Sequence, residues 1–159
     1  STLLTQIGAY TAFDADLRFV EGAEPVRMAQ LDAEALQAPG VAPLHGRLFT
    51  SEENRPGGDV HQAVISERLW RDRFAGDMAI LGATIRTAQT TLTVVGIMPT
   101  GFGFPDRVDL WTPMESYYAV SRAAKSRTQR FYGVTARLAR GGSLPQAEQE
   151  LNAIAAQLE

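Results

Sequence analysis

The 159-residue sequence contains no cysteine, a single lysine (Lys125) and only two histidines (His45 and His61). Without cysteine, the chain cannot form a disulfide, a thiolate nucleophile or a cysteine-ligated zinc site. The lysine has no glycine-rich loop beside it, which argues against the phosphate-binding loop of nucleotide hydrolases. Two histidines make a metal site only if carboxylates complete it. These absences predict a protein that is not an enzyme and that binds no cofactor or metal.

Long hydrophobic runs are also absent. Residues 87–105 carry no charge over 19 positions, about the length of a membrane span. This stretch is filled with Thr, Gln, Gly and Pro, however, and its longest apolar segment is Val94 to Met98. It therefore predicts a strand followed by a loop. The first residues lack the basic and apolar regions of a signal peptide. If the protein works at a membrane, we expect its spans to lie outside this sequence.

Composition and charge predict an ordinary folded domain. The chain is 45% hydrophobic and 21% charged, and its length suits one domain, or two small lobes that share a core. The net charge of −3 argues against a dedicated nucleic-acid binder. One segment, residues 116–147, has six cations and no acid. We expect it to face an acidic partner or lipid headgroups; a phosphate-binding strip is the alternative. The cations are Arg122, Lys125, Arg127, Arg130, Arg137 and Arg140.

Strand patterns dominate the first part of the chain. Three strand-like pieces are followed by a short helix at residues 33–38, with Asp32 as its N-cap and Pro39-Gly40 at its end. A Gly/Pro turn at residues 21–25 predicts a hairpin. After a polar loop at residues 47–59, a short strand leads into a helix that Ser66 caps and Gly76 ends. The three strand-like pieces are residues 7–13, 17–20 and 26–31.

The later segments complete an α+β pattern. Residues 84–87 and 91–97 predict paired strands, and residues 108–111 and 132–138 predict two more. Ser143 to Gln146 matches a capping box, and apolar residues recur at helical spacing from Leu144 to Leu158. The order of elements predicts an α+β fold: a mixed β-sheet built of β-α-β units, with helices packed on one side.

Several residues raise functional alternatives. His61, Asp59 and a distant serine could form a small hydrolase site, although neither histidine lies beside a serine in a glycine elbow. Asp106 and Asp109 lack the dense oxygen ligands of a calcium loop, so we expect Asp106 to close a turn and Asp109 to face solvent on a strand. The aromatic residues suggest a carbohydrate platform, but core positions are the expected place for Trp70, Phe74 and Trp111.

Two motifs carry a family resemblance. The first is Leu69-Trp70 followed by Phe74 and Gly76-Asp77, and the second runs from Val94 to Pro99. Together with Gly46 to Thr50 and Asp109 to Pro113, these resemble the MacB-like periplasmic core domain of ABC-transporter permeases, of the FtsX/MacB type. The resemblance covers most of residues 5–158. One departure concerns the hairpin at residues 88–91, where the family often has Asn-Gly and this chain has Ala88-Gln89-Thr90-Thr91, so we expect no tight type I′ turn.

The resemblance implies a porter-like domain on the periplasmic side of the bacterial inner membrane. It implies coupling of ATP hydrolysis in a cytoplasmic ABC ATPase to substrate export or to a periplasmic adaptor. The remaining transmembrane segments of the permease and a substrate protein are further implied partners. A free-standing binding or adhesion module is the alternative function.

The loop at residues 101–105 is a candidate partner contact, because exposed aromatic residues are common anchors at interfaces. Its candidate residues are Phe102, Phe104 and Arg107. The alternative is that both rings fold back as a plug over the end of the sheet.

Overall fold

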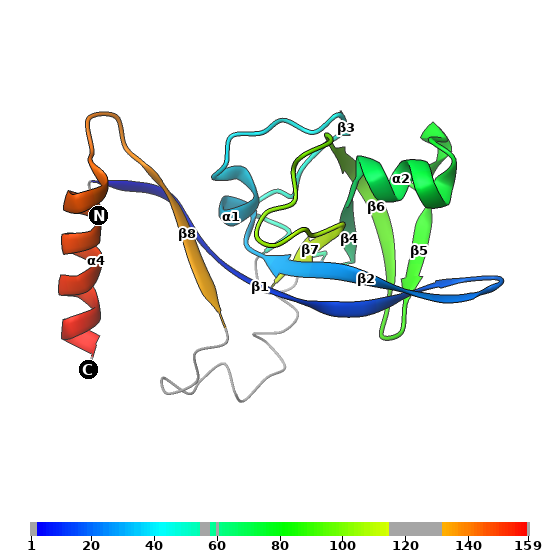
Figure 1. The fold of residues 1–159 in the computed structure, drawn as a ribbon, viewed down its shortest axis with the longest axis horizontal. Helices are drawn as coiled ribbons and strands as arrows, with labels where there is room; N and C mark the ends of the chain where they lie inside the picture. The colour runs from blue at the N-terminus through cyan, green and yellow to red at the C-terminus, as the bar shows by residue number, and fades with distance from the viewer. Residues whose placement is uncertain (1–2, 55–57, 60, 115–131, 159) are drawn as a thin grey trace.

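The computed structural model describes residues 3–54, 58–59, 61–114 and 132–158. Within these residues, one mixed sheet of eight strands and several helices confirm the α+β prediction (Figure 1). The elements in chain order are β1 (Leu4–Phe19), β2 (Gly22–Leu31), α1 (Ala33–Gln37), β3 (His45–Gly46), β4 (Gln62–Ser66), α2 (Glu67–Phe74), the 3₁₀ helix η1 (Met78–Ile80), β5 (Thr84–Thr87), β6 (Thr91–Met98), β7 (Leu110–Pro113), β8 (Gly133–Leu138) and α4 (Leu144–Leu158).

The first two strand-like pieces form one long strand, β1, which pairs with β2 in an antiparallel hairpin. The hairpin was predicted, but its turn is shorter than expected. Phe19 lies opposite Gly22, so only Val20 and Glu21 lie between the strands. Pro25 falls within β2, opposite Asp16. This is tolerated because β2 pairs with β7 on its other edge only from Met28 onward.

The strand pairings close on themselves. β2 pairs with β1 and β7, β7 with β4, β4 with β6, β6 with β5, and β5 returns to β1. Parallel pairs (β2–β7 and β4–β6) are mixed with antiparallel ones. A closed ring leaves few free strand edges, which makes it a rigid scaffold for the loops that leave it.

One hydrophobic cluster is built from all six strands of this ring and is covered by α2. It contains Trp70, at the core position expected for it, together with Val94 and Ile97 of β6, and Phe74 packs against it. Val95, which lies between Val94 and Ile97 in the sequence, packs with the second cluster instead. The β4–β6 register skips Val95, and this bulge brings Val94 and Ile97 to the same face.

A second cluster occupies the opposite face. Neighbouring residues of β4 divide between the two clusters: Ile65 lies in the first and Val64 in the second. Because successive strand residues point to opposite faces, α2 and α1 pack against different faces of this strand. The second cluster includes Leu36 of α1 with Phe49 and Trp111. The sequence pattern did not predict this division of the helices between faces.

Two predicted helix signals have different outcomes. Ser66 caps α2, since its Oγ accepts a hydrogen bond from the N–H of Leu69 at 3.0 Å. Asp32 occupies the N-cap position of α1, but its side chain makes no capping bond and instead accepts the N–H of Ala9 at 2.8 Å. Burial raises the pKa of Asp32, partly offset by this hydrogen bond.

The turns also follow from local chemistry. Gly76 has the left-handed conformation predicted at the end of α2, and Ala75 before it shares that conformation. The β5–β6 turn has no positive φ at Ala88 or Gln89, so it is not a type I′ turn, as predicted. Thr87 Oγ1 accepts the N–H groups of Gln89 and Thr90 instead.

The far end of the molecule is formed by β8 and α4. β8 pairs with the first half of β1, and α4 lies beside this pair, away from the ring (Figure 1). The predicted capping box is present in part, because Gln146 Oε1 accepts the N–H of Ser143 at 3.2 Å. Leu144, Leu151 and Ile154 of the apolar stripe are exposed. No helix in the described part of the chain is long and apolar enough to cross a membrane.

Candidate functional site

The segment that joins β6 to β7 borders a hollow of about 480 Å³. The N-terminal turn of α2 (residues 66–68) forms one wall, and loop residues 99–103 and 107–109 form the other. We call residues 99–109 the β6–β7 loop. It contains all three residues that the sequence marked as a partner contact. The hollow beside this loop is therefore the candidate binding site.

The two aromatic side chains of the β6–β7 loop pack against the core. The Phe102 ring lies 5.4 Å from the Trp111 ring, and the Phe104 ring meets Tyr10 edge-on at 5.1 Å. The indole N–H of Trp111 donates to the Phe104 carbonyl at 2.7 Å. Both phenylalanines are half-buried and pack on the second cluster. These contacts fix the loop, and its role as a partner contact stays a prediction.

Arg107 differs from the two phenylalanines. Its side chain is exposed at the rim of the hollow, and no described residue pairs with it. Its φ of 48° lies in the left-handed region that glycine tolerates best. The Cα of Arg107 would be only 3.2 Å from a Cβ at Gly103, so a side chain at that position would crowd the backbone. The loop thus presents the Arg107 side chain at the exposed rim of the hollow on a left-handed backbone.

Beneath the hollow lies a polar cluster that the sequence analysis missed. Asp109 was predicted to face solvent on a strand, and this is wrong: it is buried just before β7. Ser66 Oγ donates to Asp109 Oδ1 at 2.6 Å, and Arg68 pairs with both carboxylate oxygens. The Ser66 N–H also donates to the Asp109 carbonyl at 2.9 Å. Asp109 therefore joins the start of α2 to β7, a long-range contact that no local spacing reveals.

The other carboxylates near the hollow are also held by partners. Asp106, predicted to close a turn, is exposed and pairs with Arg27 at 3.1 Å. Glu67 accepts hydrogen bonds from the N–H and hydroxyl of Thr100 and pairs with Arg71. The Thr100 hydroxyl, the Arg71 guanidinium and the Thr100 N–H together lower the pKa of Glu67 to about 2. The Glu67 side chain thus ties α2 to the β6–β7 loop as a carboxylate.

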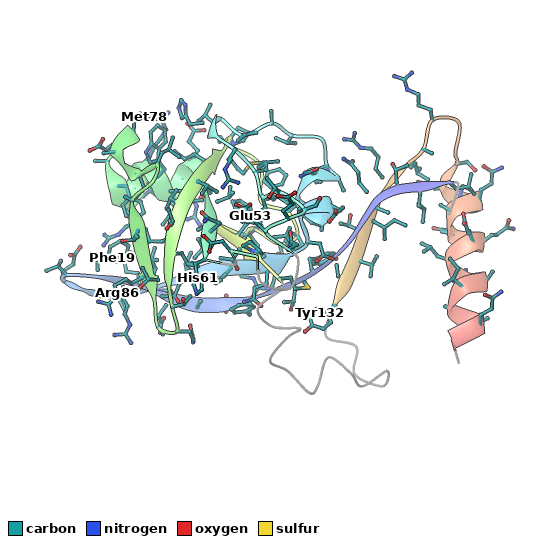
Figure 2. All side chains as sticks on the ribbon, turned by 180° about the vertical axis from the view of Figure 1, so that it is seen from behind. Phe19, Glu53, His61, Met78, Arg86 and Tyr132 are labelled. Atoms are coloured by element: carbon teal, nitrogen blue, oxygen red, sulfur yellow. The ribbon has the colours of Figure 1, made fainter. Side chains whose placement is uncertain are left out.

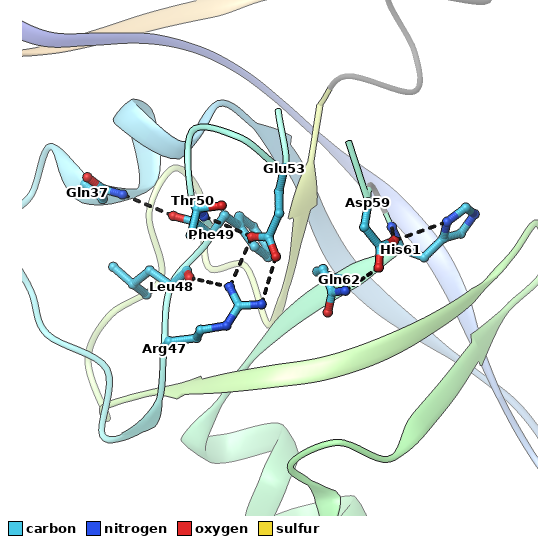
Figure 3. A network of polar contacts seen from close by, with 9 residues as sticks. All are labelled: Gln37, Arg47, Leu48, Phe49, Thr50, Glu53, Asp59, His61 and Gln62. Atoms are coloured by element: carbon cyan, nitrogen blue, oxygen red, sulfur yellow. Dashed lines mark hydrogen bonds and ion pairs between the residues drawn. The ribbon is translucent and has the colours of Figure 1, made fainter. Parts of the chain in front are cut away.

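A second polar network holds residues 47–53, the first part of the predicted polar loop (Figure 3). Arg47 binds Glu53 through two hydrogen bonds, at 2.8 and 3.1 Å, and Glu53 also accepts the Thr50 N–H. Burial raises the pKa of Glu53, but the bonds from Arg47 and Thr50 outweigh it and hold the pKa below its usual value. Gln37 anchors the same loop by donating to the Phe49 carbonyl at 3.1 Å. This network fixes backbone rather than offering a free functional group.

The histidines do not assemble a hydrolase site in the described part of the chain. His61 Nδ1 lies 3.5 Å from Asp59, but both side chains are more than half exposed and no serine bonds to His61 there (Figure 3). His45 packs edge-on against the Trp70 ring at 5.3 Å. Among the described residues, no three His, Asp or Glu side chains gather as a metal site would require.

The basic segment at residues 116–147 is only partly described. Arg137 donates to the Ala38 carbonyl at 3.0 Å and so supports the end of α1. Arg140 is exposed in the turn before α4. The other four predicted cations lie outside the described residues: Arg122, Lys125, Arg127 and Arg130.

The sequence matches one known protein family. Residues 5–154 match the sequence model of the MacB-like periplasmic core domain. A search of curated proteins found no match.

Three solved structures share the fold. The periplasmic region of MacB from Actinobacillus actinomycetemcomitans matches with a TM-score of 0.76 at 15% identity, covering 99% of this chain and 69% of that one. The extracellular domain of the noncanonical ABC-type transporter YknZ from Gram-positive bacteria gives 0.65 at 15% identity, covering 92% and 70%. A domain of a putative permease protein from Porphyromonas gingivalis gives 0.68 at 16% identity, covering 96% and 70%.

Proposed function

Because the chain belongs to the family of MacB-like periplasmic core domains, we propose that it is the extracytoplasmic domain of an ABC-transporter permease. In this role it couples ATP hydrolysis by a cytoplasmic ATPase to substrate export or to an adaptor outside the membrane. The observation that carries the proposal is the family match over residues 5–154. The family is one of transporter domains, not of enzymes.

The architecture supports a mechanical rather than a catalytic role. A closed ring of strands with buried residues on both faces transmits displacement well, because packed interiors deform little. The carboxylates around the hollow are paired with arginines, Asp109 with Arg68 and Glu67 with Arg71. Such groups stabilise the scaffold and are poor candidates for acid–base chemistry.

The β6–β7 loop is the proposed contact with another part of the transporter or with its partner. Phe102 and Phe104 anchor the loop on the ring, and Arg107 presents at the rim of the hollow a cation with which no described residue pairs. A recognition loop on a rigid scaffold needs this combination of fixed backbone and exposed side chain. The arginine would pair with an acidic group of the partner, since the guanidinium binds carboxylates through two hydrogen bonds.

The experiment is the substitution Arg107→Gly in the full-length permease. Glycine removes the side chain while suiting the left-handed backbone, so the melting temperature of the isolated chain should not fall. ATP hydrolysis by the permease reconstituted with its ATPase should change at least about twofold, the lower range by which single mutations modulate coupling between sites. The matched control is Arg140→Gly, an exposed arginine in the turn before α4. Unchanged hydrolysis in both variants would contradict the loop assignment.

A separate assay tests the non-enzymatic role. The isolated chain should not hydrolyse ATP, nitrophenyl esters or phosphate esters. Turnover by the purified chain that disappears in His61→Ala would instead support the hydrolase alternative.

A further inference from the structure

Two arginines lie opposite each other on the outer face of the ring, near the end of the β1–β2 hairpin. Arg18 of β1 faces Arg86 of β5 in the antiparallel register. Both are exposed, whereas Leu17, Ile85 and Thr87 beside them are buried, so the two guanidinium groups share the outward face. Like charges directly opposite each other in a sheet destabilise the fold. The pair therefore lowers the stability of the chain when no partner is bound.

No acid in the described part of the chain forms an ion pair with Arg18 or Arg86. Two acids of the hairpin, Glu21 and Glu24, pair with Arg73 at 2.9 and 3.1 Å. Glu24 lies opposite the buried Leu17, so its ion pair is on the other face of the hairpin. Asp16 shares the outward face with Arg18 but forms no ion pair with either arginine.

An exposed aliphatic side chain completes this surface. Val20, in the two-residue turn, is 106% exposed relative to a reference chain. Neither Val20 nor Glu21 has a positive φ, and nothing in the turn geometry requires valine. A hollow of about 310 Å³ lies between the tip and the arginines, lined by residues 18–20, 22–23 and 86. Phe19 and Arg86 mark this end of the molecule, opposite α4 (Figure 2).

We propose that Arg18, Val20 and Arg86, together called the hairpin-tip surface, bind a partner protein through a carboxylate side chain flanked by an aliphatic one. A carboxylate between the guanidinium groups removes the repulsion and accepts hydrogen bonds from both. The aliphatic neighbour covers Val20 and takes it out of water. The inference goes beyond the transport role, and a binding test on the isolated chain can fail without affecting it.

The chemistry favours a protein over the other anionic partners. Anionic bilayers attract clusters of about four to eight cations. Here two arginines without an ion pair among the described residues belong to a chain with a net charge of −3. Sites for free phosphate are commonly built from convergent backbone N–H groups at helix ends or nests. The hairpin-tip surface offers side-chain donors on strands, both of them exposed.

The test is an NMR titration of the ¹⁵N-labelled 159-residue chain. The probes are an acetylated peptide of alternating Leu and Glu, the same peptide with Gln in place of Glu, inorganic phosphate, and phosphatidylglycerol vesicles. The Leu–Glu peptide should shift the amide signals of residues 18–23 and 86, and the Leu–Gln peptide should not. Phosphate or vesicles that bind at least as well as the Leu–Glu peptide would overturn the proposal, as would absence of peptide binding.

Variants separate recognition from folding. Arg86→Gln should weaken peptide binding by up to about fivefold, the upper value for an exposed ion pair. It should also raise the melting temperature by about 1–3 °C, because one of two repelling charges is gone. Val20→Ser should weaken binding without changing the melting temperature, and the control Arg140→Gln should change neither. Peptide binding that is unchanged in Arg86→Gln or in Val20→Ser contradicts the proposal.

Discussion

Replacing Asp109 by alanine probes the buried polar cluster that joins α2 to β7. Asp109 is 7% exposed, and its carboxylate accepts a hydrogen bond from the Ser66 hydroxyl at 2.6 Å. A hydrogen bond to a charged group contributes about 1.5–3 kcal/mol. The Arg68 side chain is 71% exposed, so its ion pair contributes only about 0.2–1 kcal/mol. We therefore expect Asp109→Ala to lower the free energy of unfolding by about 2–4 kcal/mol.

The assay is urea unfolding followed by tryptophan fluorescence, with Arg68→Ala as the matched control. That control removes the exposed ion pair and keeps the Ser66 bond, so it should cost about 1 kcal/mol or less. The midpoint in urea should fall while the slope of the transition stays the same. Equal losses in Asp109→Ala and Arg68→Ala would refute the reasoning, because the exposed ion pair would then supply most of the stability.

The remaining predictions concern packing, backbone space and pH. Trp70→Ala should cost about 3–5 kcal/mol in urea unfolding, and a loss under about 1 kcal/mol would contradict its burial at 5% exposure. Gly96→Ala should lower the free energy of unfolding by about 1–3 kcal/mol or more, because the new Cβ would lie 2.1 Å from the Arg47 carbonyl oxygen. Unchanged stability would contradict this and would show that β3 moves freely. Glu67 has a pKa of about 2 in the fold against the usual 4.5, so its contribution is complete above pH 4.5 and is lost as the pH falls toward 2. The difference in melting temperature between the wild type and Glu67→Gln should shrink over that interval, and a constant difference would contradict the assignment.

Much of the fold was predictable because local chemistry determines it. Ser66 as a cap, the strands around residues 84–97 and the last helix each follow from a pattern within one segment. Ring closure was not predictable, because β1 pairs with β5 and β2 pairs with β7 across long separations in sequence. The bulge at Val95 was not predictable for the same reason, since it arises only from the pairing of β6 with β4.

The candidate site was predicted only in part. The sequence marked Phe102, Phe104 and Arg107, and these residues do belong to one loop beside a hollow. It did not reveal Asp109, because a single acid between apolar residues fits either an exposed or a paired buried position. Nor did it reveal the Arg18–Arg86 pair, since 68 positions separate the two residues and only the β1–β5 register brings them together.

The most direct test of coupling uses the absence of cysteine. A single cysteine in place of Arg107 gives the domain one thiol, in a full-length permease whose other cysteines are replaced. The measurement is the rate of maleimide labelling from outside, with the cytoplasmic ATPase nucleotide-free or trapped with ADP and vanadate. We expect the rate at position 107 to differ several-fold between the two states, while a cysteine in place of Arg140 serves as the reference. Equal rates in both states at position 107 would contradict the claim that ATP hydrolysis is coupled to this domain.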